Sequence, residues 1–207
     1  MPVTAILGPM MSGKSTQLLR YLERSIRGNK KVCLIRPMID DRDFFSHSKG
    51  TQTIFDSLSI TTYYFGSNFS ENFNTYTSIL ENYNVLGIDE VQFLDHAVSY
   101  ISGFIQKNKI VYVSGLLATS ENKVFPNVLD ILPFCDYIEK LSGVCTMCGS
   151  DIGNYTYYKE GEKHTDIIVG GADKYTVICG QCLMGGKNEY LWKSGLWIWQ
   201  NEKRKLL

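Results

Sequence analysis

Residues 8–16 read Gly8-Pro9-Met10-Met11-Ser12-Gly13-Lys14-Ser15-Thr16, and they match the pattern G-x-x-x-x-G-K-[ST] at every fixed position. The apolar, β-branched residues 3–7 before this stretch are typical of a buried strand, and Leu18, Leu22 and Ile26 after it recur at helical spacing. A strand, a glycine-rich turn and a helix N-terminus in succession direct backbone N–H groups and the helix dipole at an anion. The stretch therefore predicts a loop that binds nucleotide phosphates.

The fixed residues of this loop have separate chemical tasks. We expect Gly8 and Gly13 to give backbone freedom where a Cβ would clash. Lys14 is expected to reach the β- and γ-phosphates, and the Ser15 hydroxyl is expected to bind Mg²⁺. The helix should begin at the loop and end near Gly28. The alternative is a chance match, which the strand before and the helix after disfavour.

The composition limits the possible functions. The chain has 207 residues, 44% hydrophobic and 20% charged, enough for one sizeable α/β core and a small addition. Its 21 Lys and Arg balance 21 Asp and Glu, which argues against a dedicated nucleic-acid binder. No apolar run approaches the roughly 18 residues of a membrane span, and we expect no signal peptide. Six cysteines in such a chain indicate a reducing, cytoplasmic location.

Further strands and helices alternate along the chain. This alternation predicts right-handed crossovers and a doubly wound, mostly parallel sheet. Residues 36–57 are polar, and we expect them to be irregular; the cluster Asp40-Asp41-Arg42-Asp43 within them is read as a solvated loop, with an active-site loop as the alternative. The predicted strands are 31–35, 60–65, 85–88, 110–113 and a last one at 137–141, and the predicted helices are 68–83, 97–107 and a short segment at 128–132.

A second chemical landmark is Asp89-Glu90, which follows the apolar segment 85–88. The carboxyl end of a strand beside a phosphate loop is where a nucleotide-binding sheet places an acid near Mg²⁺. We therefore expect Asp89 to act on the metal, directly or through water. The Glu90 side chain starts in the opposite direction and could face a substrate hydroxyl.

The four cysteines Cys145, Cys148, Cys179 and Cys182 form two C-x-x-C pairs, separated by residues 149–178. Four thiolates held in pairs can surround one tetrahedral Zn²⁺; the alternative is four unligated cysteines. The character of the sequence changes at Ser142, so we divide the chain into a nucleotide-binding domain at 1–141, a zinc lobe at 142–190 and a tail at 191–207. The tail holds three tryptophans and several basic residues, and it is either packed or an interaction arm.

In this order, the phosphate loop, the Asp-Glu strand end and the four-cysteine lobe resemble the type II thymidine kinases of cells and large DNA viruses. The resemblance covers most of residues 3–186. It is carried by residues 8–16, by Ile88-Asp89-Glu90-Val91-Gln92-Phe93 and by Gly170-Gly171-Ala172-Asp173-Lys174-Tyr175, which is similar to the lasso loop of that family. It implies a P-loop NTPase-type α/β fold with a small C-terminal zinc-binding lasso lobe.

The resemblance also implies roles for individual residues. Glu90 would be the general base. Asp40 would join Ser15 and Asp89 at Mg²⁺, and Arg42 would join residues 8–16 at the ATP phosphates. For Phe93, Phe125 and Tyr175 the residues alone favour ordinary core packing. The residues implied on the nucleoside side are Met10, Phe93, Ser120, Phe125, Asp166, Ile167, Ile168, Val169, Gly170 and Tyr175.

One loop departs from the family pattern. Where the family has Leu-Asp-Gly-Thr-Phe, this chain has Leu116-Leu117-Ala118-Thr119-Ser120, so Ser120 replaces an aromatic residue at the nucleoside. This replacement predicts a roomier or more polar pocket wall.

The reaction implied by the resemblance is transfer of the γ-phosphoryl group of ATP to the 5′-hydroxyl of thymidine, giving dTMP in nucleotide salvage. It also implies ATP, Mg²⁺ and structural Zn²⁺, a homotetramer and feedback inhibition by dTTP. Two alternatives are a kinase for another deoxynucleoside and a nucleic-acid-stimulated ATPase that binds through the cysteine lobe. Zero net charge counts against the ATPase.

Overall fold

A computed structural model describes residues 2–40, 45–46, 48–159 and 170–185. Its contacts divide the chain into two units. The first contains Met1–Leu7, Gly13–Leu117 and Val124–Leu141, and the second contains Gly8–Ser12, Ala118–Lys123 and Ser142–Leu207. Within the described ranges, none of the helices combines the length and the apolarity that crossing a bilayer requires.

The first unit is built on a six-stranded sheet with the strand order β3-β2-β4-β5-β1-β6. The pairs β2–β3, β2–β4, β4–β5 and β1–β6 are parallel, which confirms the predicted α/β fold with a mostly parallel sheet. The strands are β1 (Val3–Gly8), β2 (Val32–Pro37), β3 (Thr61–Phe65), β4 (Val85–Ile88), β5 (Ile110–Leu116) and β6 (Tyr137–Lys140).

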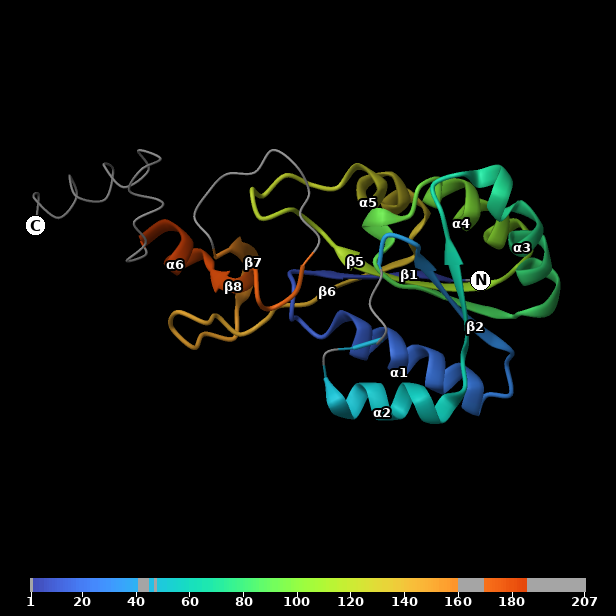
Figure 1. Ribbon diagram of the computed structural model, residues 1–207, viewed down its shortest axis with the longest axis horizontal. Helices are drawn as coiled ribbons and strands as arrows, with labels where there is room; N and C mark the ends of the chain where they lie inside the picture. The colour runs from blue at the N-terminus through green and yellow to red at the C-terminus, as the bar shows by residue number, and fades with distance from the viewer. Residues whose placement is uncertain (1, 41–44, 47, 160–169, 186–207) are drawn as a thin grey trace, which may run out of the picture. The chain divides into compact units, whose positions relative to one another are not determined.

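Helices cover both faces of this sheet (Figure 1). On one face lie α1 (Lys14–Arg27) and α2 (Lys49–Leu58); on the other lie α3 (Phe69–Asn82), α4 (Ala97–Gln106) and α5 (Pro126–Ile131). Two short 3₁₀ turns, η1 (Val91–Phe93) and η2 (Leu132–Phe134), complete the unit.

Alternate residues of β1 feed two separate cores. Leu7 belongs to the core with α3, α4 and α5, whereas Ile6 packs in the core that contains Leu18 and Leu22 of α1. A strand buried on both faces needs a continuous apolar run rather than an alternating one, as this sequence has. On β4 a Cβ on Gly87 would lie 2.9 Å from the Leu22 Cδ1 atom, so the glycine lets α1 approach the sheet.

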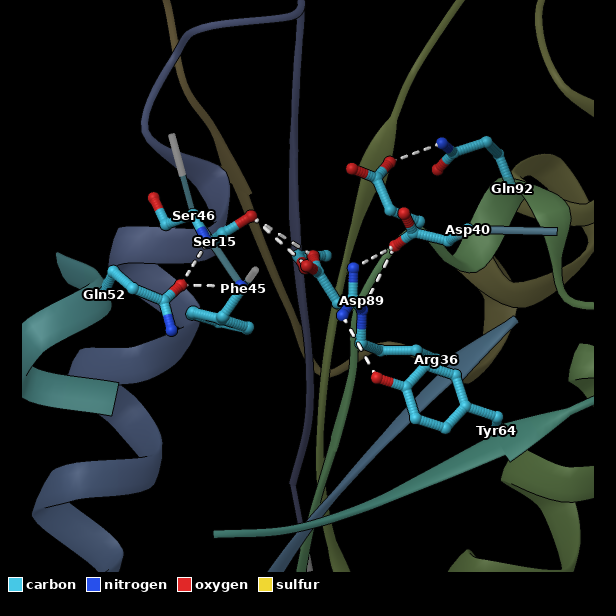
Figure 2. Close-up of polar contacts among 11 residues, drawn as sticks. Ser15, Arg36, Asp40, Phe45, Ser46, Gln52, Tyr64, Asp89 and Gln92 are labelled. Atoms are coloured by element: carbon cyan, nitrogen blue, oxygen red, sulfur yellow. Dashed lines mark hydrogen bonds and ion pairs between the residues drawn. The ribbon is translucent and has the colours of Figure 1, made fainter. Parts of the chain in front are cut away.

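Helix α2 lies where an irregular segment was expected, and that expectation was wrong for residues 49–57. The Ser48 side chain caps the helix by accepting a hydrogen bond from the Thr51 N–H group at 3.4 Å. The Gln52 Oε1 atom accepts a hydrogen bond from the Phe45 N–H group at 2.7 Å, and it fixes the chain before the helix (Figure 2). The Phe45 ring stacks on Phe55 with 4.5 Å between ring centroids. Strand β2 also continues to Pro37, further than predicted.

The second unit contains an antiparallel pair of strands that was not predicted, β7 (Gly153–Tyr158) and β8 (Tyr175–Cys179). Helix α6 (Gly180–Gly185) follows directly. The Cys145, Ile178 and Cys179 side chains form the small core of this unit. Strand β8 ends at Cys179, the first cysteine of the second C-x-x-C pair.

Candidate functional site

The predicted phosphate loop follows β1 and turns through two left-handed residues, Met11 with φ 57° and Gly13 with φ 83°. Such a turn directs successive N–H groups toward one concavity. The positive φ of Gly13 is the backbone freedom that was expected there, and a Cβ on Gly13 would contact no protein atom within 4 Å. Helix α1 begins at Lys14, which is 8% exposed.

Two hydrogen bonds within the second unit fix the tip of the loop. The Ser12 hydroxyl donates to the Pro9 carbonyl at 2.9 Å. The Met10 N–H group donates to the Thr156 hydroxyl on β7 at 3.0 Å. Thr156 is 6% exposed, and no motif marks it in the sequence. The loop tip is thus fixed from a strand far away along the chain.

Ser15 and Asp89 come together at the carboxyl edge of the sheet. The Ser15 hydroxyl lies 3.4 and 3.3 Å from the two Asp89 carboxylate oxygens (Figure 2). Neighbouring oxygen ligands of an octahedral cation of magnesium's size are separated by roughly 3 Å. Asp89 is 1% exposed, and the hydroxyl of the fully buried Ser114 on β5 donates to its Oδ1 atom. Ser114 therefore fixes the carboxylate from the neighbouring strand.

Glu90 leaves the strand in another direction because its own backbone is left-handed, with φ 52°. Its side chain is half-buried, unlike that of Asp89. The Gln92 side-chain amide donates to the Glu90 Oε2 atom at 2.6 Å. The two adjacent acids consequently have different surroundings.

Asp40 is buried against an arginine that the sequence did not indicate. The Asp40 Oδ2 atom accepts hydrogen bonds from the Arg36 Nε atom at 3.1 Å and from its Nη2 atom at 2.7 Å (Figure 2). The Arg36 guanidinium also lies 5.7 Å from the centroid of the Tyr64 ring. Arg42, which the family resemblance implies at the ATP phosphates, lies outside the described residues.

The thiols of Cys145, Cys148, Cys179 and Cys182 all lie within 4.8 Å of one another. The Cys148 and Cys179 sulfur atoms are 3.6 Å apart. Four sulfurs around a tetrahedral ion with bonds of about 2.3 Å are about 3.8 Å apart. The two predicted pairs therefore form one cluster that can hold a metal ion.

Opposing shifts in pKa within this cluster fit a site built for a cation. Burial raises the pKa of the Cys145 thiol, but hydrogen bonds from the backbone of Cys179, Cys148 and Met147 outweigh burial and lower it to about 6. A side-chain hydrogen bond with Cys148, together with burial, raises the pKa of Cys182 to about 12. Thiols this close cannot all ionise without a positive charge between them.

Comparison with known proteins identifies the family. The family model for thymidine kinase matches residues 1–183. The chain belongs to the thymidine kinase family. Thymidine kinase 1 of Dictyostelium discoideum is 32% identical over 196 residues, which are 90% of this chain and 79% of that protein.

Poxvirus members of the thymidine kinase family are similarly related. The thymidine kinase of myxoma virus (strain Lausanne) is 32% identical over 178 residues, 86% of this chain and 93% of its own length. That of vaccinia virus (strain Ankara) is 30% identical over 190 residues, 88% and 97% of the two chains. The family resemblance inferred from the motifs is therefore confirmed, and membership of this kinase family implies ATP as the phosphoryl donor.

The nucleoside-side residues implied for a thymidine kinase occur in several places. Phe93 and Phe125 make an edge-to-face contact, with centroids 5.9 Å apart, and both pack against the core. Tyr175 is buried on β8 against Tyr158, with centroids 5.3 Å apart. Ser120 is half-buried in a turn of the second unit.

Core packing and a binding role are both compatible with these positions, and a buried aromatic ring does not distinguish them. Met10 and Gly170 are described and half-buried, whereas the four remaining residues implied for the nucleoside lie outside the described residues: Asp166, Ile167, Ile168 and Val169.

Four polar residues near the site were missed: Arg36, Gln92, Ser114 and Thr156. Ser114 and Thr156 contact predicted residues from strands that are distant in the sequence, so these two contacts depend on the fold and not on local sequence. Arg36 and Gln92 lie four and two residues from their partners Asp40 and Glu90, but nothing in the sequence marked these contacts. A weak signal was present at Ser114, a polar residue that ends the apolar run 110–113 at the predicted ligand edge.

Proposed function

We propose that this member of the thymidine kinase family transfers the γ-phosphoryl group of ATP to the 5′-hydroxyl of thymidine, giving dTMP. The observation that carries the reaction class is the 3.3 Å approach of the Ser15 hydroxyl to Asp89, with Glu90 next to it. This approach joins the phosphate loop to the strand-end acids. The relatives named thymidine kinase support thymidine as the acceptor.

Residues 8–16 bind the triphosphate in this proposal. The loop N–H groups and the Lys14 ammonium hold phosphate oxygens, and Arg42 balances charge on the transferred group. Ser15 and Asp89 would hold Mg²⁺, which would supply positive charge against the phosphate oxygens. Because Asp40 already accepts two hydrogen bonds from Arg36, we assign it to a water of the metal shell and not to the metal itself.

Glu90 is the general base. Phosphoryl transfer passes through a loose transition state, so the residues mainly position the reactants and stabilise charge. Glu90 accepts the proton of the 5′-hydroxyl as that oxygen bonds to phosphorus. Its half-buried side chain, in contrast to the buried Asp89, suits contact with a substrate.

The nucleoside side rests on the family relationship. We propose that Met10, Phe93, Ser120, Phe125 and Tyr175 line the nucleoside site. Backbone groups of residues 166–170 would hydrogen-bond the edge of the base, and a site built in this way rejects bases with another donor pattern.

We further propose the division into domains 1–141, 142–190 and 191–207. One structural Zn²⁺ would be bound by the four clustered cysteines, and its protein ligands would leave no position for water. A homotetramer, inhibition by dTTP and a cytoplasmic location follow from the family relationship alone.

A transfer assay from γ-labelled ATP to each of the four deoxynucleosides tests the proposed reaction. Labelled dTMP as the main product supports it. Preferential labelling of another deoxynucleoside would replace the acceptor but keep the kinase. ATP hydrolysis that needs DNA or RNA, without a labelled nucleotide, would favour the ATPase alternative.

A further inference from the structure

The Gln92 side chain is fixed on several sides. It is 4% exposed, and its Oε1 atom accepts a hydrogen bond from the Leu116 N–H group on β5 at 2.9 Å. The side chain of Asn127 on α5 donates to the Gln92 carbonyl at 3.3 Å and to the Leu94 carbonyl at 3.2 Å. Both the backbone and the side chain of Gln92 are thus held by neighbouring elements.

The orientation of the Gln92 amide follows from its partners. The Leu116 N–H group can only donate, so the amide oxygen must face it and the amide NH₂ must face Glu90. At Glu90 this NH₂ meets the Oε2 atom, which accepts the hydrogen bond. The hydrogen bond therefore fixes the direction in which the Glu90 carboxylate points.

The space for the Gln92 amide depends on Gly115. A Cβ on Gly115 would lie 2.6 Å from the Gln92 Oε1 atom and 2.8 Å from the Val91 Cγ1 atom. Real Cβ atoms do not approach other atoms this closely, so the amide or the 3₁₀ turn would have to move. Gly115 on β5 is therefore part of the same arrangement.

We propose that Gln92 is a positioning residue for the catalytic base, and that its amide, fixed by Leu116 and by the missing side chain at Gly115, presents the Glu90 carboxylate to the acceptor hydroxyl. This inference rests on the proposed function, in which Glu90 is the base. It explains how a half-buried residue with a left-handed backbone keeps one orientation. Orientation matters because a displacement of about 1 Å can cost about 100-fold in rate.

The direct test is Gln92→Met, which keeps the length of the side chain and removes both hydrogen-bonding groups. We expect kcat to fall about 10- to 100-fold, with little change in KM for thymidine or ATP. This split between kcat and KM is the readout, because a contact that orients the base acts in the transition state and not in the binding of either substrate.

Gln92→Glu separates charge from shape. The new carboxylate can still accept from Leu116, but it places an oxygen where the amide NH₂ now lies 2.6 Å from Glu90. Two carboxylates at that distance repel each other, so Glu90 should turn away and kcat should fall further than in Gln92→Met. Gly115→Ala displaces the amide without changing its chemistry and should also lower kcat more than it changes KM.

The other ionisable groups of the site are Asp89 at the end of β4, the Arg36–Asp40 pair at the end of β2 and Lys14 at the start of α1. They are the same in every variant. A difference in kcat between variants therefore reports the changed contact with Glu90.

Asn72→Leu is the matched control. It removes a buried amide that donates to the Gly66 carbonyl at 2.8 Å and to the Tyr100 hydroxyl at 2.9 Å, away from the site. It should lower the melting temperature with little change in kcat. A comparable fall of kcat in this control would assign the effect to general loss of stability and overturn the proposal.

The decisive comparison also includes Glu90→Gln. If this variant loses kcat while Gln92→Met and Gly115→Ala leave kcat unchanged, the role of Gln92 is wrong and the base assignment stands. If Glu90→Gln keeps near-normal kcat, the base assignment itself fails. Should Gln92→Met not fold, Gln92→Glu and Gly115→Ala decide the question by the same split between kcat and KM.

Discussion

Asp89 and Glu90 are neighbours in sequence, but the protein gives their carboxylates different partners. Asp89 is buried and contacts the hydroxyls of Ser15 and Ser114, whereas Glu90 is half-buried and contacts the Gln92 amide. Three hydroxyl or amide contacts thus divide one acidic dipeptide into a metal-side acid and a substrate-side acid. The alternative is that Asp89 is the substrate-side acid and Glu90 the metal-side acid, and mutation can exclude it.

Glu90→Gln tests the substrate-side role. Glutamine keeps the size of the side chain but cannot accept a proton, and a positioned base contributes about 10²–10⁴-fold to the rate. We expect kcat to fall by that order, with KM for both substrates little changed, in steady-state assays. In Asp89→Asn the Mg²⁺ requirement should rise instead. Near-normal kcat in Glu90→Gln, with the loss appearing only in Mg²⁺ or ATP affinity, would exchange the two roles.

Ser114→Ala tests the support of the metal-side acid. Partners that orient a metal ligand affect metal affinity by about 10- to 100-fold. Loss of the Ser114 hydroxyl should therefore raise the Mg²⁺ concentration needed for half-maximal activity by at least about 10-fold. The control is Ser102→Ala, which removes a half-buried hydroxyl that bonds the Val98 carbonyl on α4. An unchanged Mg²⁺ dependence in Ser114→Ala would show that Asp89 is oriented without it.

At the level of elements, the strands that are buried on both faces were predicted from the sequence, whereas helix α2 and the strand pair β7–β8 were not. Strands β1, β2, β4 and β5 are buried on both faces, so their apolar runs are visible in the sequence. Helix α2 was missed because the apolar stripe of this mostly polar segment is short, and its capping contacts come from residues before it. The hairpin β7–β8 was missed because it is rich in tyrosine, which has an apolar ring and a polar hydroxyl. The sequence of these strands therefore shows no clear alternation of apolar and polar residues.

The candidate site shows the same limit of local patterns. Lys14, Ser15, Asp89 and Glu90 could be selected because each belongs to a motif within a single segment. Gln92 stood inside a quoted motif, yet its task depends on Leu116, which another strand brings to it. Contacts between strands require the sheet order β2-β4-β5, which no single segment of the sequence specifies.

Cys33 on strand β2 leads to a prediction about how the stability of the protein depends on pH. Burial of Cys33, which is 0% exposed, raises the pKa of its thiol from 9.0 to about 12. The folded state therefore retains the proton that the unfolded state releases above pH 9. Its contribution to stability is complete below pH 9 and is lost between pH 9 and about 12, at up to about 1.4 kcal/mol per pH unit.

Cys33→Val should remove this contribution and place an apolar side chain that favours strands in the core. We expect the free energy of unfolding of the variant to fall less steeply than that of the wild type between pH 9 and 12. Urea titrations followed by circular dichroism under reducing conditions measure both curves. Tyr63 is present in both proteins, and its pKa is raised to about 12 mainly by its hydrogen bond with Tyr83. Because Cys33 also raises the pKa of Tyr63, the measured difference includes that contribution. Parallel curves would refute the assignment to Cys33.

At the level of the whole molecule, the strand pair β7–β8 connects the tip of the phosphate loop to the cysteine cluster. Residues 8–12 are grouped with the second unit, and the Met10 N–H group bonds Thr156 on β7. Strand β7 pairs with β8, which ends at Cys179 of the cluster. A change at the cysteines can therefore reach the tip of the phosphate loop through one pair of strands.

Metal removal is the corresponding prediction. Elemental analysis should find one Zn²⁺ per chain, and Cys179→Ser should lose it and loosen the hairpin β7–β8. Because the implied lasso residues lie between β7 and β8, calorimetry should show nucleoside binding weakened more than ATP binding. Cys135→Ser, outside the cluster, is the matched control and should retain zinc. Protein without zinc, in which all six thiols react freely with a thiol reagent, would exclude the structural zinc site.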